Sequence, residues 1–258
     1  MLLIQKEEAQ GKMHLKHQEL MQSYESRSKF FSLIAHDLRS PLSSLVQGMQ
    51  VLKFISADGD INKRNEMTGI IADRLSQTYQ LTDNLLRWSL SEKGIIKPNF
   101  EAMSIYDAVK ATVELVQADA DSKNIILKLA VNKEKLLLLD KNMFSTVIRN
   151  LLSNAIKFTP KGGTISIISE KNIKERSVKI HVKDTGVGIP EDKLSKLFTI
   201  DSEFHTDGTN KEKGTGFGLK LSAELIHKLN GKIYATRNED VGTTITLEFP
   251  IETIAPQP

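Results

Sequence analysis

The sequence predicts an α-helical hairpin that forms a dimeric four-helix bundle, followed by an α+β sandwich. In the first 92 residues, apolar side chains recur in alternating steps of four and three, a spacing typical of helices that pack against one another. The segment Ser56-Ala57-Asp58-Gly59-Asp60 interrupts this pattern with turn-forming residues. Beyond Pro98, short segments with helical and with strand periodicity alternate. These observations divide the chain into a helical part and a mixed part.

The helical part is predicted to consist of two helices, over residues 5–54 and 62–92. Neither helix can bury its apolar stripe alone, so we expect two hairpins to associate as a homodimer. The alternative is an intramolecular hairpin that packs on the second domain. The stripe residues are Met13, His17, Leu20, Tyr24, Arg27, Phe31, Ile34 and Leu38 in the first helix, and Met67, Ile71, Arg74, Thr78, Leu81, Leu85 and Trp88 in the second.

The mixed part begins after Gly94, because Lys97-Pro98 prevents the second helix from resuming. We place the domain boundary between residues 95 and 96 and expect residues 253–258 to form a disordered tail. Alternating apolar residues over 164–170 and 177–183 predict a β-hairpin. Helices on one face of a mixed sheet then make an α+β sandwich. The other predicted elements are helices over 104–121, with Ser104 as N-cap, 141–157 and 215–229, and strands over 125–131, 136–139, 232–236 and 243–250.

The composition excludes several classes of function. The 258 residues carry a net charge of only +3 and 6% are aromatic, so we expect no nucleic-acid partner. The absence of cysteine excludes disulfides and thiolate metal sites. The longest aliphatic run, Leu136–Leu139, is far shorter than the ~20 residues of a membrane span. We therefore expect a soluble, cytoplasmic chain without membrane contact of its own, which can still be the inner part of a longer, membrane-anchored protein.

One histidine stands out on the first predicted helix. His36 lies two residues past the stripe residue Ile34, a rotation of about 200° at roughly 100° per residue, so its imidazole is predicted to point to solvent. A single histidine is most often incidental, but Asp37 beside it on an otherwise apolar helix favours a chemical role. Pro41 removes a helical hydrogen bond and crowds the carbonyl of Asp37, at a cost of about 3 kcal/mol. We expect the helix to bend there and to leave room for a second domain.

The helix predicted over residues 141–157 carries two amides and an ammonium on one face. Asn150, Asn154 and Lys157 are spaced by four and three residues, which aligns them along the helix. Amide oxygens suit a hard cation and a lysine suits phosphate, so this face fits a magnesium-bound triphosphate. Taken alone, the same pattern is also that of an ordinary polar helix face.

Two glycine-rich segments follow. Asp184-Thr-Gly-Val-Gly-Ile-Pro190 comes directly after a strand, where a carboxylate can accept from an exocyclic amine and glycines let the backbone approach a flat ring. Gly214-Thr-Gly-Phe-Gly-Leu219 opens a helix, whose first amides form an anion site. Neither segment is a P-loop or a Rossmann fingerprint. Each could also be a simple turn.

The order of these motifs resembles one known family. His36-Asp-Leu-Arg-Ser-Pro-Leu42 is similar to the phosphoacceptor box of sensor histidine kinases, usually His-Glu/Asp-x-x-Thr/Asn-Pro-Leu. Asn150 to Pro160, Asp184 to Pro190, Leu197-Phe198, Gly214 to Leu219 and Gly242-Thr-Thr resemble the successive nucleotide boxes of their catalytic domain. That domain is of the GHKL type, which is similar to the ATPases of gyrase, the MutL proteins and the heat-shock chaperones. The resemblance covers about residues 27 to 250.

The resemblance implies four regions and two cofactors, ATP and Mg²⁺. Residues 1–26 would be an N-terminal coiled-coil signalling helix, 27–95 the dimerisation and histidine phosphotransfer domain, 96–252 the ATP-binding catalytic domain and 253–258 the tail. It also implies that residues 199–213 form a mobile lid over the nucleotide. On the phosphate side, the resemblance implies that Asn154 coordinates Mg²⁺ with Asn150 nearby, that Lys157 binds phosphate, and that Gly214, Gly216 and Gly218, in a segment with Thr215 and Leu219, present amides to phosphate. On the adenine side, it implies that Asp184 accepts from the adenine amine and that Gly186 and Gly188 give the ring room. Phe158 would contact adenine or ribose, and Thr243 would line the adenine pocket.

The implied chemistry is phosphoryl transfer to an imidazole nitrogen of His36, with Asp37 taking or orienting the proton on the far nitrogen. The phosphoryl group would then pass to an aspartate of a response regulator, in trans. Ser40 departs from the usual Thr or Asn at a position tied to dephosphorylation of the regulator, which predicts weak phosphatase activity. Two alternatives remain: a non-catalytic dimeric scaffold that binds ATP, and a related ATPase or serine-kinase anti-sigma factor.

Overall fold

The computed structural model describes residues 13–14, 16–17, 21, 38–39, 41–55, 60–92, 97–133, 136–172, 174, 176–198, 208–209 and 217–251. The chain divides into two compact units, residues 1–82 and 83–258. The division falls inside the second helix, so the predicted boundary at residues 95 and 96 stays a prediction. Each unit is described by itself.

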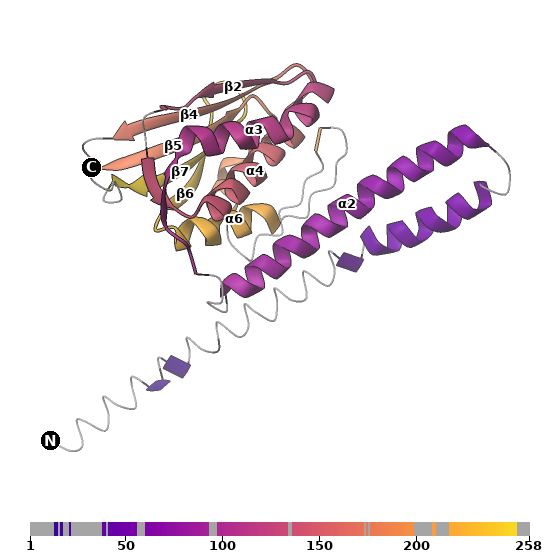
Figure 1. The fold of residues 1–258 in the computed structure, drawn as a ribbon, viewed down its shortest axis with the longest axis horizontal. Helices are drawn as coiled ribbons and strands as arrows, with labels where there is room; N and C mark the ends of the chain where they lie inside the picture. Colours follow the sequence, from indigo (N-terminus) through magenta and orange to yellow (C-terminus); the bar gives the residue numbers. More distant parts are fainter. Residues whose placement is uncertain are drawn as a thin grey trace. The chain divides into compact units, whose positions relative to one another are not determined.

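The first unit contains a helix over residues 41–55 and most of α2 (Ile61–Glu92). The two helices run side by side in opposite directions (Figure 1). Gly48 lies so close to α2 that a Cβ at this position would come 3.1 Å from Cγ1 of Ile71. Asp60 caps α2, because its Oδ1 accepts from the backbone N–H of Lys63 at 3.1 Å. The helix predicted over 62–92 is confirmed; the dimeric bundle stays a prediction.

The second unit alternates helices and strands, as predicted from residue 104 onward. Its helices are α3 (Ile105–Ser122), α4 (Lys141–Phe158), α5 (Glu191–Leu194) and α6 (Phe217–Lys228). Its strands are β1 (Glu101–Ser104), β2 (Ile126–Ala130), β3 (Leu136–Leu139), β4 (Thr164–Asn172), β5 (Ser177–Asp184), β6 (Lys232–Arg237) and β7 (Thr243–Pro250). The sequence did not predict β1 or the single turn α5.

Side chains fix the first turns of α3 and α4. Ser104 is the N-cap of α3, as predicted, since its Oγ accepts from the N–H of Asp107 at 3.2 Å. Asp140 caps α4 through Oδ1, which accepts from the N–H of Met143 at 2.9 Å. The second oxygen of Asp140 accepts from the N–H of Asn99, also at 2.9 Å. One carboxylate therefore joins the chain ahead of β1 to the start of α4.

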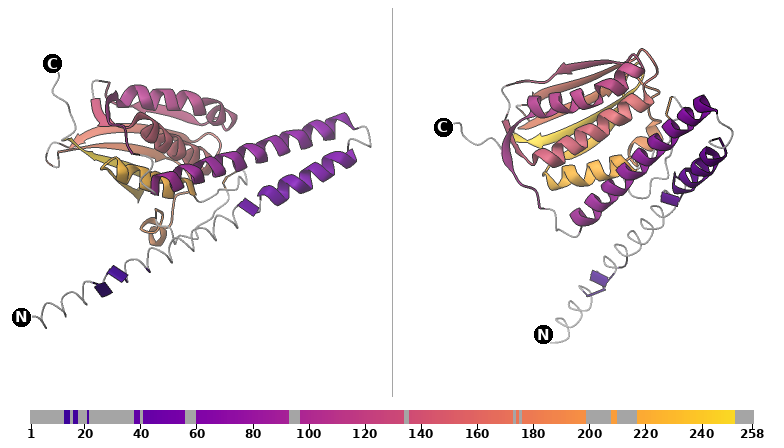
Figure 2. Two further views of the ribbon diagram at one scale, coloured as in Figure 1. Left: turned by 60° about the horizontal axis from the view of Figure 1, so that its bottom comes forward. Right: turned by 45° about the vertical axis from the view of Figure 1, so that its right-hand side comes forward.

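The main sheet has the strand order β2-β4-β5-β7-β6, and β1 pairs with β3 in a separate two-stranded sheet. Within the main sheet β2 and β4 are parallel and the other pairs are antiparallel, which confirms the predicted mixed sheet. Helices α3, α4 and α6 lie on one face of this sheet (Figures 1 and 2). The architecture of this unit is the predicted α+β sandwich.

The core lies between α4 and the sheet. Because side chains alternate along a strand, every second residue of the central strands faces the helices and is buried. The aromatic rings of Phe144 and Phe249 meet there, with centroids 6.2 Å apart. The buried stripe of α4 consists of Met143, Phe144, Val147, Ile148, Leu151, Leu152, Ala155 and Ile156. The opposite, polar face of α4 carries the predicted site residues, so packing of the stripe determines where they project.

Candidate nucleotide site

The site is organised around Asp184, the last residue of β5 and the central carboxylate of the predicted site. The residue is 9% exposed. Oδ1 accepts from the backbone N–H groups of Gly186 at 2.8 Å and Thr243 at 3.1 Å, whereas Oδ2 accepts from no described residue. Burial raises the pKa of this carboxyl, and the two N–H donors partly offset that increase. Asp184 therefore holds one oxygen in place and presents the other to a donor.

Glycines surround this carboxylate because side chains would collide with the backbone. A Cβ at Gly186 would come 2.6 Å from the carbonyl oxygen of Phe158. Gly242 has a φ of 92° and Gly188 a φ of 73°, both in the region that favours glycine. A Cβ at Gly188 would lie 3.4 Å from the carbonyl oxygen of Gly242, so the two loops touch. The predicted role of Gly186 and Gly188, to give a flat ring room beside Asp184, stays a prediction.

The polar face of α4 supplies the second half of the site. Asn150, Asn154 and Lys157 are all partly exposed. The side-chain amide of Asn150 donates to the carbonyl oxygen of Gly218 at 3.3 Å, which connects α4 with the first turn of α6. Among the described residues, none donates a hydrogen bond to the oxygen of that Asn150 amide. The ammonium of Lys157 lies 4.7 Å from the centre of the Phe158 ring.

One hydrogen bond brings the two halves together. The N–H of Val187 donates to the carbonyl oxygen of Phe158 at 3.2 Å, so the loop after β5 meets the end of α4. A buried carboxylate with a free acceptor oxygen therefore borders a helix face that carries amides and an ammonium. The structure assembles in this region the predicted residues Asn150, Asn154, Lys157, Phe158, Asp184, Gly186, Gly188, Gly218, Leu219 and Thr243.

Some predicted site residues lie outside the described residues. These are His36, Asp37 and Ser40 of the phosphoacceptor box, and Gly214, Thr215 and Gly216 of the second glycine-rich segment. Within the predicted lid, residues 199–213, only Gly208 and Thr209 are described. The roles assigned to all of these positions stay predictions.

Comparison with known proteins places this site in a family. The family described as "Histidine kinase-, DNA gyrase B-, and HSP90-like ATPase" matches residues 139–253. The sensor histidine kinase WalK of Bacillus subtilis is 26% identical over 231 residues, which cover 88% of this chain and 37% of WalK. Sporulation kinase A of the same organism is 29% identical over 218 residues, covering 84% of this chain and 33% of that kinase. Residues 139–253 thus match this ATPase family, and the chain is similar to sensor histidine kinases over most of its length.

A solved structure shows that the fold agrees as well. The histidine kinase ThkA in complex with the response regulator protein TrrA superposes with a TM-score of 0.66 at 24% identity, covering 84% of this chain and 59% of that chain. The chain spans only about a third of the length of WalK and sporulation kinase A. Among the described residues, no helix has both the length and the apolar character to cross a membrane.

Sequence reasoning missed two side chains that build the candidate site. Asn238 donates through Nδ2 to the carbonyl oxygens of Asp184 at 2.8 Å and Val241 at 3.0 Å. Its Oδ1 accepts from the hydroxyl of Thr244 at 2.6 Å, so a single amide holds the turn before β7 against Asp184. The turn-forming run Arg237-Asn-Glu-Asp240 gave a signal for a bend but not for this contact. The second residue is Lys123, whose buried ammonium lies at the end of α4.

Proposed function

We propose that this chain autophosphorylates on His36 from ATP and passes the phosphoryl group to an aspartate of a response regulator. The observation that carries the proposal is the arrangement around Asp184, whose Oδ2 is left as a buried acceptor beside three glycines and the polar face of α4. Oδ2 can accept from the exocyclic amine of adenine. The backbone at Gly186, Gly188 and Gly242 leaves room for the flat ring.

The residues of α4 fit the magnesium-bound phosphates of ATP. Magnesium prefers oxygen ligands and keeps few protein ligands besides substrate phosphates, so the amide oxygens of Asn154 and Asn150 suit it. Lys157 supplies the positive charge for phosphate. When bound, the ion would neutralise charge on the transferring phosphoryl group. Thr243, whose N–H orients Asp184, would line the adenine side of the pocket, and the amides at the start of α6 would face phosphate.

The transfer step is carried by His36. An imidazole nitrogen attacks the γ-phosphorus, the N–P bond forms and the bond from that phosphorus to the bridging oxygen of ADP breaks. Asp37 accepts or orients the proton on the other ring nitrogen, so that the lone pair faces the phosphorus. Neutral imidazole is nucleophilic near physiological pH, which makes a strong base unnecessary.

A response regulator in trans would accept the phosphoryl group. The structural relative ThkA is described in complex with the response regulator protein TrrA, which supports the same class of partner for this chain. Phosphohistidine would donate its phosphoryl group to a receiver-domain aspartate. The reverse activity, dephosphorylation of the regulator, would be weak because Ser40 replaces the usual Thr or Asn.

The helical part is proposed to dimerise through apolar side chains that its own helices leave exposed. On the helix over residues 41–55, Leu45, Gly48 and Leu52 form a half-buried stripe, and Gly48 faces Ile71 of α2. A second stripe, Leu42, Val46 and Met49, is exposed, with Val46 at 59%.

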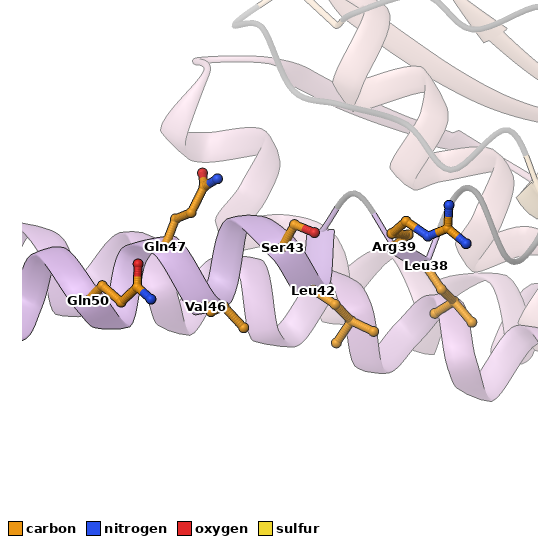
Figure 3. A pocket seen from close by; sticks show the side chains of 7 residues that line it. All are labelled: Leu38, Arg39, Leu42, Ser43, Val46, Gln47 and Gln50. Carbon is orange, nitrogen blue, oxygen red and sulfur yellow. The ribbon is translucent and has the colours of Figure 1, made fainter.

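Figure 3 shows Leu38, Leu42 and Val46 on one side of an open pocket along this helix. In α2 the apolar side chains Leu75 and Tyr79 are likewise exposed. We propose a second copy of the chain as the occupant, because two hairpins with two stripes per helix complete a four-helix bundle.

The decisive test is incubation of the purified chain with γ-labelled ATP and Mg²⁺. We expect label on the protein that is lost in acid and stable in base, as a phosphorus–nitrogen bond requires. A chain that binds ATP without acquiring label would be a non-catalytic scaffold. Acid-stable label on an added substrate would indicate a serine kinase related to anti-sigma factors.

A further inference from the structure

The last turn of α4 ends on a buried lysine from another helix. Lys123 follows α3 as its C-cap residue and is 5% exposed. Its ammonium donates to the carbonyl oxygens of Ile156 at 3.0 Å and Lys157 at 3.1 Å. Carbonyls in the last turn of a helix lack partners within the helix, and a cation there also interacts favourably with the helix dipole. The ammonium of Lys123 therefore caps the C-terminal end of α4.

The same ammonium holds Thr209, 86 residues further along the chain. The hydroxyl of Thr209 accepts from Nζ of Lys123 at 2.9 Å. The backbone N–H of Thr209 donates to the carbonyl oxygen of Lys157 at 3.0 Å. The single proton of the Thr209 hydroxyl lies within reach of the carbonyl oxygens of Lys157, at 3.1 Å, and Thr159, at 3.2 Å. Lys123 and Thr209 thus share the carbonyl of Lys157, and each also contacts one further carbonyl.

These peptide units carry side chains that the proposed function assigns to the nucleotide. The carbonyl of Phe158, between those of Lys157 and Thr159, accepts from Val187 in the loop after Asp184. Four consecutive carbonyls, from Ile156 to Thr159, are therefore held by hydrogen bonds from outside the helix. The Cα atoms from which the side chains of Lys157 and Phe158 project cannot shift without breaking some of these bonds.

We infer that Lys123 and Thr209 are positioning residues that fix Lys157 for the phosphates of ATP. The inference rests on the proposed function, in which Lys157 binds phosphate and Asp184 binds adenine. It assigns two residues outside the nucleotide boxes to one half of the site. The half built by Asp184, Gly186 and Thr243 has its own hydrogen bonds and meets the end of α4 through the Val187–Phe158 bond, which involves neither Lys123 nor Thr209.

The test compares the affinities of two ligands, ATP with Mg²⁺ and adenosine, which lacks phosphate. Thr209→Val removes the hydroxyl without changing the shape, and we expect it to weaken ATP roughly three- to tenfold, the range of one lost hydrogen bond. Adenosine affinity should stay within about twofold, and Thr209→Ser should restore ATP affinity. Unchanged ATP affinity in Thr209→Val, or an equal loss for both ligands, would overturn the inference.

Lys123→Met tests the other member of the pair. Lys123→Met should lower ATP affinity at least as much as Thr209→Val. The double variant should lose little more affinity than Lys123→Met alone, because both changes remove the hydrogen bond between Lys123 and Thr209. Fully additive losses would overturn the coupling. Lys110→Met, at an exposed lysine of the same helix, is the matched control and should bind both ligands like the parent. If Lys123→Met does not fold, Thr209→Val and Thr209→Ser still decide the question. A parent chain that binds no ATP would instead overturn the proposed function.

Discussion

Gly242 lies directly against Asp184, so closely that a Cβ at Gly242 would overlap the carbonyl oxygen of Asp184. The same Cβ would come 2.8 Å from Oδ1 of Asp184, the oxygen that accepts the two backbone N–H groups. The position of Asp184 therefore depends on the absence of a side chain in the turn before the neighbouring strand β7. This contact explains why glycine stands ahead of Thr243 at the start of β7.

Gly242→Ala should consequently lower both stability and nucleotide affinity. A left-handed backbone costs a non-glycine residue about 1–2 kcal/mol, and displacement of Asp184 adds to that cost. Gly162→Ala is the matched control, since Gly162 has a φ of 83° but no neighbour within 4 Å of its Cβ position. Thermal melts and ATP titrations of both variants provide the measurement. Equal ATP affinities in the two variants would contradict the contact described above.

Asp184→Asn should weaken ATP binding and leave the fold intact. The asparagine oxygen can still accept from Gly186 and Thr243, but its amide places a donor where Oδ2 would accept from the adenine amine, at a cost on the order of 1–3 kcal/mol. Burial raises the pKa of Asp184, so at neutral pH the charged carboxylate costs the folded state some stability. Asparagine carries no charge and avoids this cost, so the variant should melt no lower than the parent at neutral pH. Calorimetry that finds unchanged ATP affinity would show that adenine binds elsewhere.

His36→Gln should abolish autophosphorylation while ATP still binds. Glutamine keeps a polar side chain of similar reach but offers no imidazole nitrogen to the γ-phosphorus. The measurement is acid-labile label after incubation with γ-labelled ATP, alongside a nucleotide titration of the same preparation. Acid-labile label that persists in this variant would move the phosphoacceptor to another histidine, with His205 and His181 as the first to replace.

A fragment of residues 1–95 should be dimeric, and a fragment from residue 96 onward should be monomeric. The exposed stripe of Leu42, Val46 and Met49 belongs to the first fragment, and the sequence of the second has no heptad stripe of this kind. Sedimentation at micromolar concentration measures both states. Val46→Glu should shift the first fragment toward monomer. If the unsubstituted fragment of residues 1–95 is itself monomeric, the four-helix bundle is ruled out.

Ser40 should support weak phosphatase activity toward the cognate regulator. Ser40 follows His36 by four residues, which is one turn in the predicted helix, and its hydroxyl samples more rotamers than that of threonine, at a cost of about 0.5 kcal/mol. Ser40→Thr should raise the activity a few-fold, and Ser40→Ala should remove it. Neither change should alter the autophosphorylation rate by more than about threefold, since a factor of three is roughly this same energy. The assay is loss of regulator phosphate with ADP present; equal rates for Ser40→Ala and the parent would leave the hydroxyl without a role.

Much of the second unit could be predicted because its signals are local. Alternating apolar residues predicted β4 and β5. The helical periodicity predicted α3 and α4, and Ser104 marked the start of α3. Asp184, Gly186 and Thr243 were expected together because the order of the motifs resembles one family. The strand β1 was missed because its four residues, Glu-Ala-Met-Ser, show no period, and it forms only by pairing with β3.

Residues whose roles depend on distant contacts could not be found from the sequence. Lys123 reads as an ordinary exposed lysine after a helix, and only the approach of α4 and Thr209 buries its ammonium. Asn238 reads as one polar residue of a turn, and its contact with Asp184 joins positions 54 residues apart. Local periodicity contains no information on which helix end meets which side chain.

The carboxylate of Asp140 gives the second unit a mechanical property. Its two oxygens join the N–H of Asn99 to the first turn of α4. The segment ahead of β1 and the N-terminus of the helix that carries Asn154 and Lys157 therefore cannot separate without loss of one of these two hydrogen bonds.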